Sequence, residues 1–139
     1  MCSSDLTRED VVARVRELTG GAGLPVVYDS VGASTYEKSL ACLRRRGLLV
    51  SFGSASGPVP PFDLFRLNRM GSLYVTSAGL ADYTHTRQEL LERAEDLFAV
   101  VTSGAVRIEV KQRYPLAEAA RAHRDLEARR TSGSSILLP

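Results

Sequence analysis

The chain has 139 residues, a length that usually forms one domain around a single core. Hydrophobic residues make up 44% and charged residues 24% of the chain, which is typical of a globular protein. The sequence contains no apolar run long enough to span a membrane. The net charge of +2 does not indicate a nucleic-acid or membrane partner. The two cysteines, Cys2 and Cys42, lack metal-ligand spacing, so we expect a reduced, cytoplasmic protein.

In the first half of the chain, segments of helical periodicity alternate with short apolar runs. A helix is predicted over Glu9–Leu18, with Thr7 as its N-cap. A second helix is predicted from Ser34, with Glu37 as its capping-box partner, to Gly47. The predicted strands are Val26–Ser30, Leu48–Phe52 and Ser72–Thr76, with a short helix over Asp63–Asn68 before the third. This alternation indicates a parallel α/β sheet over residues 8–77.

The second half is less regular and could pack elsewhere than on that sheet. Its longest predicted helix, Thr86–Thr102, carries an apolar face made of Leu90, Leu91, Ala94, Leu97, Phe98 and Val101. Val106–Val110 alternates between apolar and polar residues, which predicts a half-buried strand. Pro115 is expected to start a helix that reaches Arg130, and Ile136–Leu138 is the last predicted strand.

Small polar residues and glycines follow each predicted strand of the first half, in the runs Asp29–Gly32, Ser51–Ser54 and Tyr74–Ser77. Ligands of open parallel sheets bind beyond the carboxyl ends of the strands. Gly32 and Gly53 would let a ligand approach the backbone, and Ser and Thr hydroxyls suit a ribose or a carboxamide. A glycine after one strand is more often only a turn, but three such ends in series favour a ligand crevice.

Other kinds of site have weak support. His85 lies in a predicted loop, and His123 on an apolar helix face is more typical of a core or hydrogen-bonded structural histidine than of a catalytic one. Glu92 and Glu95 are expected to lie on a solvated helix face. Cysteines, histidines and acidic residues show no zinc-site spacing, so hydrolase and metal-site interpretations rank low.

Four sequence runs resemble those of a known family and occur in the same order as in that family: VVYDSVG, RRGLLVSFG, NRMGSLYVT and PLAEAARAHRDLEARRTSGSSILLP. Together they resemble the C-terminal part of the zinc-independent NADPH:quinone oxidoreductases, the zeta-crystallin-like branch of the medium-chain dehydrogenase/reductase superfamily. The resemblance extends from about Thr7 to Pro139. It implies the C-terminal half of a Rossmann doubly wound parallel sheet, followed by the segment that completes the family's catalytic domain.

The resemblance also implies a function and a site. Members transfer hydride from NADPH to quinones or related electrophilic carbonyl compounds without a metal, and usually form dimers, here expected through the strand at Ser72–Thr76. Gly32 would lie near the adenosine ribose, and Phe52, Gly53 and Ser54 would line the nicotinamide ribose. Thr76 and Ser77 would lie beside the carboxamide. No residue of this chain is expected to be catalytic in its own right, and no metal ligand is expected.

The chain departs from the family in length, since a complete member is more than twice as long. The strands present correspond to strands four, five and six of the order 3-2-1-4-5-6, and the glycine-rich phosphate turn is absent from the sequence. We therefore expect one wall of a cofactor crevice and little activity from this chain alone. Residues 1–6 are expected to be a non-native leader, because Cys2–Leu6 matches DNA that resembles the end of a sequencing adapter; an ordinary variable N-terminus is the alternative.

The expected organisation is thus a leader over residues 1–6, a partial Rossmann domain over 7–84 and a catalytic-domain segment over 85–139. Two other functions remain open. One is a non-catalytic α/β dimerisation module, and the other is a fragment of an enoyl-reductase-like relative acting on enones. The substrate cannot be chosen from this part of the family, because substrate contacts come largely from the domain that this sequence lacks.

Overall fold

The computed structural model describes residues 9–139, and the chain divides into two compact units, residues 1–82 and 83–139. The expected leader at residues 1–6 and the expected N-cap Thr7 lie outside the described residues. The first unit contains α1 (Val11–Leu18), β1 (Leu24–Asp29), α2 (Tyr36–Ala41), β2 (Leu43–Ser51), α3 (Phe65–Arg69) and β3 (Tyr74–Ser77). Then follow α4 (Leu80–Tyr83), α5 (Arg87–Thr102), β4 (Val110–Pro115), the 3-10 turn η1 (Leu116–Glu118), α6 (Ala119–Glu127) and β5 (Ser134–Leu138).

The first unit is built on a three-stranded parallel sheet in the order β1-β2-β3. Val27 pairs with Leu49, and Leu49 pairs in turn with Val75, so the three strands end at the same edge of the sheet. Strands four, five and six of the doubly wound fold would form this arrangement, and the expected fold class is confirmed. Among the described strands, β1 and β3 are edges with one neighbour each.

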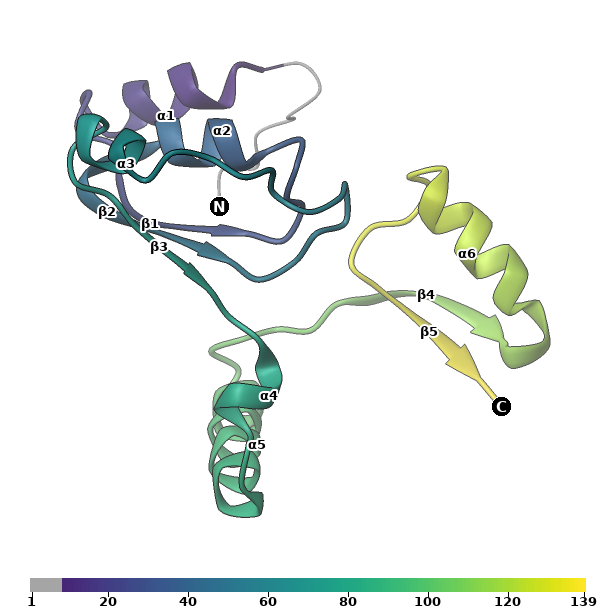
Figure 1. Ribbon diagram of the computed structural model, residues 1–139. Helices are drawn as coiled ribbons and strands as arrows, with labels where there is room; N and C mark the ends of the chain where they lie inside the picture. Colours follow the sequence, from purple (N-terminus) through teal and green to yellow (C-terminus); the bar gives the residue numbers. More distant parts are fainter. Residues whose placement is uncertain (1–8) are drawn as a thin grey trace. The chain divides into compact units, whose positions relative to one another are not determined.

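The helices α1, α2 and α3 lie on one face of this sheet (Figure 1). The core beneath them is a cluster of leucines, Leu40, Leu43, Leu49 and Leu73, each at most 7% exposed. Leu40 comes from α2 and Leu49 from the middle of β2, so this cluster joins the helix layer to the sheet. Its burial fixes the register in which β2 presents its carboxyl end to the site described below.

Several boundaries in the first unit differ from the prediction. The N-cap of α1 is Asp10, whose side chain accepts hydrogen bonds from the amides of Val12 and Ala13. The α2 helix ends at Ala41 rather than Gly47, because Leu43 already belongs to β2 and pairs with Leu24. The predicted capping box of Ser34 and Glu37 is wrong: Thr35 is the N-cap and makes no side-chain capping bond.

The second unit contains a parallel pair, β4 and β5, connected through η1 and α6. Tyr114 is 7% exposed, and its hydroxyl donates a hydrogen bond to Asp125 on α6 (3.1 Å), which ties the helix to the strand. The start of α5 is as predicted, because Thr86 and Glu89 form a reciprocal capping box. No helix within residues 9–139 has both the length and the apolar character to cross a membrane.

Predicted burial in the second unit is largely wrong. The strand expected over Val106–Val110 lies at Val110–Pro115, and Val106 and Ile108 are exposed. The buried residue of α6 is Ala122, whereas His123 and Leu126 are exposed, so the predicted core role of His123 fails. The apolar face of α5 is also open, with Leu97 54% and Phe98 64% exposed. Apolar periodicity identified the face of α5 but could not supply a surface against which it packs.

Candidate functional site

A cavity of about 610 Å³ opens at the carboxyl ends of β2 and β3, entirely within the first unit. Five of the six predicted site residues line it, namely Phe52, Gly53, Ser54, Thr76 and Ser77. The remaining lining residues of the cavity are Tyr36, Leu40, Leu49, Ser51, Pro58, Val59, Pro60, Pro61, Phe62, Leu64, Val75 and Ala78. The sequence therefore located the strand ends correctly, but it missed the loop from Pro58 to Leu64 that covers the cavity.

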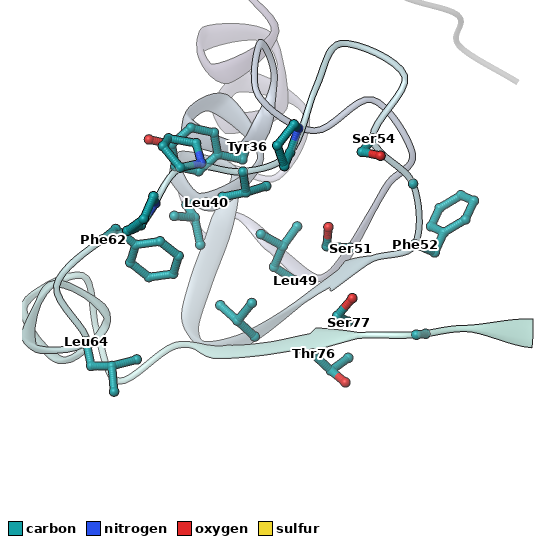
Figure 2. Close-up of a pocket in the computed structure, with 17 residues that line it drawn as sticks. Tyr36, Leu40, Leu49, Ser51, Phe52, Ser54, Phe62, Leu64, Thr76 and Ser77 are labelled. Carbon is teal, nitrogen blue, oxygen red and sulfur yellow. The ribbon is translucent and has the colours of Figure 1, made fainter. Parts of the chain in front are cut away.

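The cavity has a polar end and an apolar end (Figure 2). At the polar end Ser51 and Ser77 are paired in register on neighbouring strands, and both lie on the side of the sheet that Leu49 faces. At the apolar end the rings of Tyr36 and Phe62 stack with their centroids 6.4 Å apart. Such a lining offers neutral hydroxyls beside apolar surface, which suits a polar ring system with a flat hydrophobic part.

Two of the predicted residues border the cavity with their side chains turned away from its apolar end (Figure 2). The ring of Phe52 packs edge-to-face against Tyr28, with centroids 6.5 Å apart. The side chains of Thr76 and Ser77 lie on opposite faces of β3. Because side chains alternate along a strand, Ser51 and Ser77, rather than Phe52 and Thr76, present their side chains to the covered side.

Gly32 does not line the cavity; it is buried against the loop that follows β2. Its φ is +89°, and a Cβ there would collide with the carbonyl oxygen of Gly57. At Gly53 a Cβ would lie 2.5 Å from the carbonyl oxygen of Ser30. At both positions the absence of a side chain allows close contact with the backbone of a neighbouring loop, whereas the sequence predicted close contact with a ligand.

Backbone and serine hydrogen bonds join these two loops, the β1 turn (residues 30–35) and the β2 loop (residues 52–57). Ser56 donates from both its amide (2.8 Å) and its hydroxyl (2.7 Å) to the carbonyl of Val31. The amide of Ser34 donates to the Ser56 hydroxyl (3.0 Å), and the amide of Ala33 donates to the carbonyl of Gly57 (3.0 Å). The position of Gly53 and Ser54 in the cavity wall thus depends on the β1 turn.

The β1 turn is itself organised by Asp29, which is 5% exposed. Its carboxylate accepts hydrogen bonds from the amides of Val31 (2.8 Å) and Gly32 (3.1 Å) and from the hydroxyls of Thr35 (2.9 Å) and Ser39 (2.7 Å). Burial raises the pKa of Asp29, but the four donors outweigh it and the pKa lies below the ordinary value. Asp29 is therefore a buried, ionised and fully partnered carboxylate.

An ion pair supports the apolar end of the cavity. Arg66 of α3 binds both carboxylate oxygens of Glu37 on α2, and the distance from Nη1 to Oε1 is 2.7 Å. This hydrogen-bonded guanidinium lowers the pKa of Glu37 to about 2. Glu37 thus binds Arg66 instead of forming the predicted capping box with Ser34. The ion pair holds α3 near α2, at the end of the loop that carries Phe62.

The remaining candidates do not form a second centre. His85 and His123 are both exposed, as are Glu92 and Glu95 on α5. Within residues 9–139 no three His, Cys, Asp or Glu side chains are grouped so that they could hold a metal ion. Cys42 is a free, buried thiol at the end of α2, and burial raises its pKa.

Comparisons with known proteins agree on one group. The family described as "zinc-binding dehydrogenase" matches residues 3–137. The quinone oxidoreductase of Pseudomonas aeruginosa is 55% identical over 97% of this chain and 42% of its own length. Quinone oxidoreductase 1 of Escherichia coli is 53% identical over 94% of this chain and 41% of its own. A 2-haloacrylate reductase of Burkholderia is 43% identical over 94% of this chain and 40% of its own.

Solved structures give the same result. The crystal structure of Escherichia coli quinone oxidoreductase complexed with NADPH superimposes with a TM-score of 0.87 at 51% identity, over 97% of this chain and 42% of that one. A mycobacterial protein complexed with NADPH gives a TM-score of 0.84 at 53% identity, over 95% of this chain and 42% of that one. The chain spans less than half the length of the relatives it matches.

Proposed function

Since this chain belongs to the zinc-binding dehydrogenase family, we propose that it forms the C-terminal part of an NADPH-dependent quinone oxidoreductase. The reaction reduces quinones or related electrophilic carbonyl compounds. The observation that carries the proposal is the cavity at the ends of β2 and β3, in a chain 51% identical to a quinone oxidoreductase whose structure was solved with NADPH. Alone, the chain provides one wall of a crevice that strand one and the phosphate turn would complete.

The residues of this wall fit the nicotinamide half of the cofactor. Gly53, Ser54 and the hydroxyl of Ser51 would contact the ribose, while Ser77 and the backbone of Thr76 would hold the carboxamide. Phe52 would border the same ribose, and Gly32 would lie towards the adenosine ribose through the β1 turn. When bound, NADPH supplies hydride chemistry; the chain orients the ring and its apolar lining excludes water.

The test uses a hybrid enzyme, in which residues 7–137 replace the aligned segment of Escherichia coli quinone oxidoreductase 1. We expect Ser77→Ala to lower kcat/KM for NADPH about tenfold, because one neutral hydrogen bond to the carboxamide is lost. The matched control is Ser103→Ala, which removes a hydroxyl that donates to the carbonyl of Val100 (3.1 Å) and accepts from the amide of Ala105 (3.5 Å), and that does not line the cavity. Equal effects of the two substitutions would contradict the assignment of Ser77.

A second candidate substrate class is an activated carbon–carbon double bond. The 43% identity to a 2-haloacrylate reductase favours it, and the cavity lining described above does not discriminate a quinone from an enone. Comparing kcat/KM of the native full-length protein for a benzoquinone and for an acyclic enone separates the two. The hybrid cannot make this distinction, since the part of the Escherichia coli enzyme that it retains would supply most substrate contacts.

We further propose a homodimer of the complete protein through β3. The support is that β3 is an edge strand whose four residues are all exposed, which leaves its outer edge open to a second strand. We expect Val75→Lys to convert the hybrid from dimer to monomer in sedimentation velocity, while Val106→Lys in a loop of the second unit leaves the dimer intact. A dimer with no NADPH-dependent rise in melting temperature would instead favour the non-catalytic dimerisation module.

We also propose the domain boundaries, the independence from zinc and the cellular location of the complete protein. Residues 85–139 would belong to the catalytic domain, while residues 7–84 supply the cofactor wall. Zinc independence is proposed from the resemblance to the zinc-independent quinone oxidoreductases. A cytoplasmic location without nucleic-acid or membrane partners is supported by the near-neutral charge and the free Cys42. Metal analysis of the active native protein tests the zinc statement.

A further inference from the structure

The two oxygens of the buried Asp29 carboxylate have different partners. Oδ1 accepts the amides of Val31 (2.8 Å) and Gly32 (3.1 Å), which belong to the β1 turn. Oδ2 accepts the hydroxyl of Ser39 (2.7 Å), which belongs to α2. The hydroxyl of Thr35 lies 2.9 Å from both oxygens. One oxygen therefore serves the loop and the other serves the helix layer, and the two can be perturbed separately.

From the β1 turn the contacts continue to the cavity wall. Oδ1 fixes the amide of Val31, and the carbonyl of Val31 accepts both hydrogen bonds from Ser56. Oδ1 also fixes Gly32, whose bare Cα faces the carbonyl of Gly57 and the Cα of Ser54. Asp29 itself does not line the cavity, and neither does Ser56. The side chain of Asp29 therefore acts on Gly53 and Ser54 through the two joined loops, while the backbone carbonyl of Asp29 also accepts the amide of Phe52 (2.9 Å), a bond that substitution of the side chain leaves in place.

We propose that Asp29 is a positioning residue for the nicotinamide half of the cofactor, acting through the β1 turn on the β2 loop. The proposal rests on the function proposed above, since it gives the β2 loop its cofactor contacts. A carboxylate suits this task because it accepts several donors at once, which orders both the turn amides and the helix hydroxyls. Because the turn amides bond to Oδ1 and the Ser39 hydroxyl bonds to Oδ2, an effect on the turn can be separated from the loss of a helix contact.

The first test measures amide hydrogen exchange in the full 139-residue chain. Asp29→Ala removes both acceptors, and we expect the amides of Ala33 and Ser56 to lose about tenfold in protection. Asp29→Asn keeps an oxygen for the turn amides and is expected to restore most of that protection. Ser39→Ala removes only the bond to Oδ2, so it should leave both amides as in the parent chain. Equal losses in Asp29→Ala and Ser39→Ala would overturn the proposal.

The second test measures cofactor kinetics in the hybrid enzyme. We expect Asp29→Ala to raise KM for NADPH about tenfold with kcat within about twofold, because uniform binding is lost. Asp29→Asn should stay within about threefold of the parent KM, and Ser39→Ala within about twofold. An unchanged KM in Asp29→Ala, or no rescue by Asn, would overturn the proposal.

If Asp29→Ala fails to fold, Ser56→Ala gives the decisive result. It removes the hydroxyl that bridges Val31 and Ser34 while leaving Asp29 intact, and Ser56 is exposed. We expect a rise in KM for NADPH of about threefold or more, and an unchanged KM would overturn the proposal. A parent hybrid that folds but lacks activity would refute the proposed function instead, and the exchange data would still decide whether Asp29 orders the loop.

Discussion

Gly32→Ala is expected to lower the free energy of unfolding of the first unit by about 2–4 kcal/mol, from a left-handed backbone penalty and a forced displacement of the β2 loop. The φ of Gly32 is +89°, a conformation that costs an L-residue about 1–2 kcal/mol. The added methyl would also collide with the carbonyl of Gly57. That contact is backbone, so relief requires moving the whole loop rather than rotating a side chain.

The matched control is Gly20→Ala. Gly20 has φ +58° and no atom within 4 Å of an added Cβ, so it carries only the backbone penalty. Hydrogen exchange of the amides in β1 and β2 is the suitable measurement, because a chain of two units need not unfold in one step. Equal destabilisation by the two substitutions would show that the contact between the β1 turn and the β2 loop is unimportant.

The second large effect concerns activity. The purified 139-residue chain is expected to show little or no steady oxidation of NADPH with a quinone. In the doubly wound fold a glycine-rich turn and a helix N-terminus bind the pyrophosphate, and this sequence contains no such turn. Each 1.4 kcal/mol of lost contact weakens binding about tenfold, so losing that anchor costs orders of magnitude in affinity. Turnover of the isolated chain at the rate of a complete reductase would contradict the proposal.

Much of the first unit could be predicted because its strands are short apolar runs that end in small residues. The strand predicted over Leu48–Phe52 was found in this way, and it overlaps β2 (Leu43–Ser51), the central strand of the sheet, in which Leu49 is buried. The end of α2 was misplaced because Leu43 fits both the helical spacing from Tyr36 and Leu40 and the pairing with Leu24. Only tertiary contact decides between these alternatives, since the local pattern is the same.

The site was predicted only in part for a related reason. Glycine and serine after a strand can be identified from sequence, and five of the six predicted residues line the cavity. Whether Gly32 faces a ligand or a neighbouring loop depends on residues 53–57, which are distant in sequence. The role of Asp29 could not be predicted either, because Ser39 becomes its partner only once α2 packs on the sheet. The prediction of buried residues in the second unit failed, because apolar periodicity does not supply a surface against which a helix face packs.

This chain is proposed to supply the nicotinamide wall of a quinone reductase, and the turnover of the hybrid enzyme tests that role most directly. We expect the hybrid to oxidise NADPH with a quinone at a rate within about tenfold of the Escherichia coli parent, since the inserted segment is 53% identical to the parent segment that it replaces. A hybrid that folds as the parent does, yet reduces quinone no faster than the isolated 139-residue chain, would contradict the proposed role of this chain.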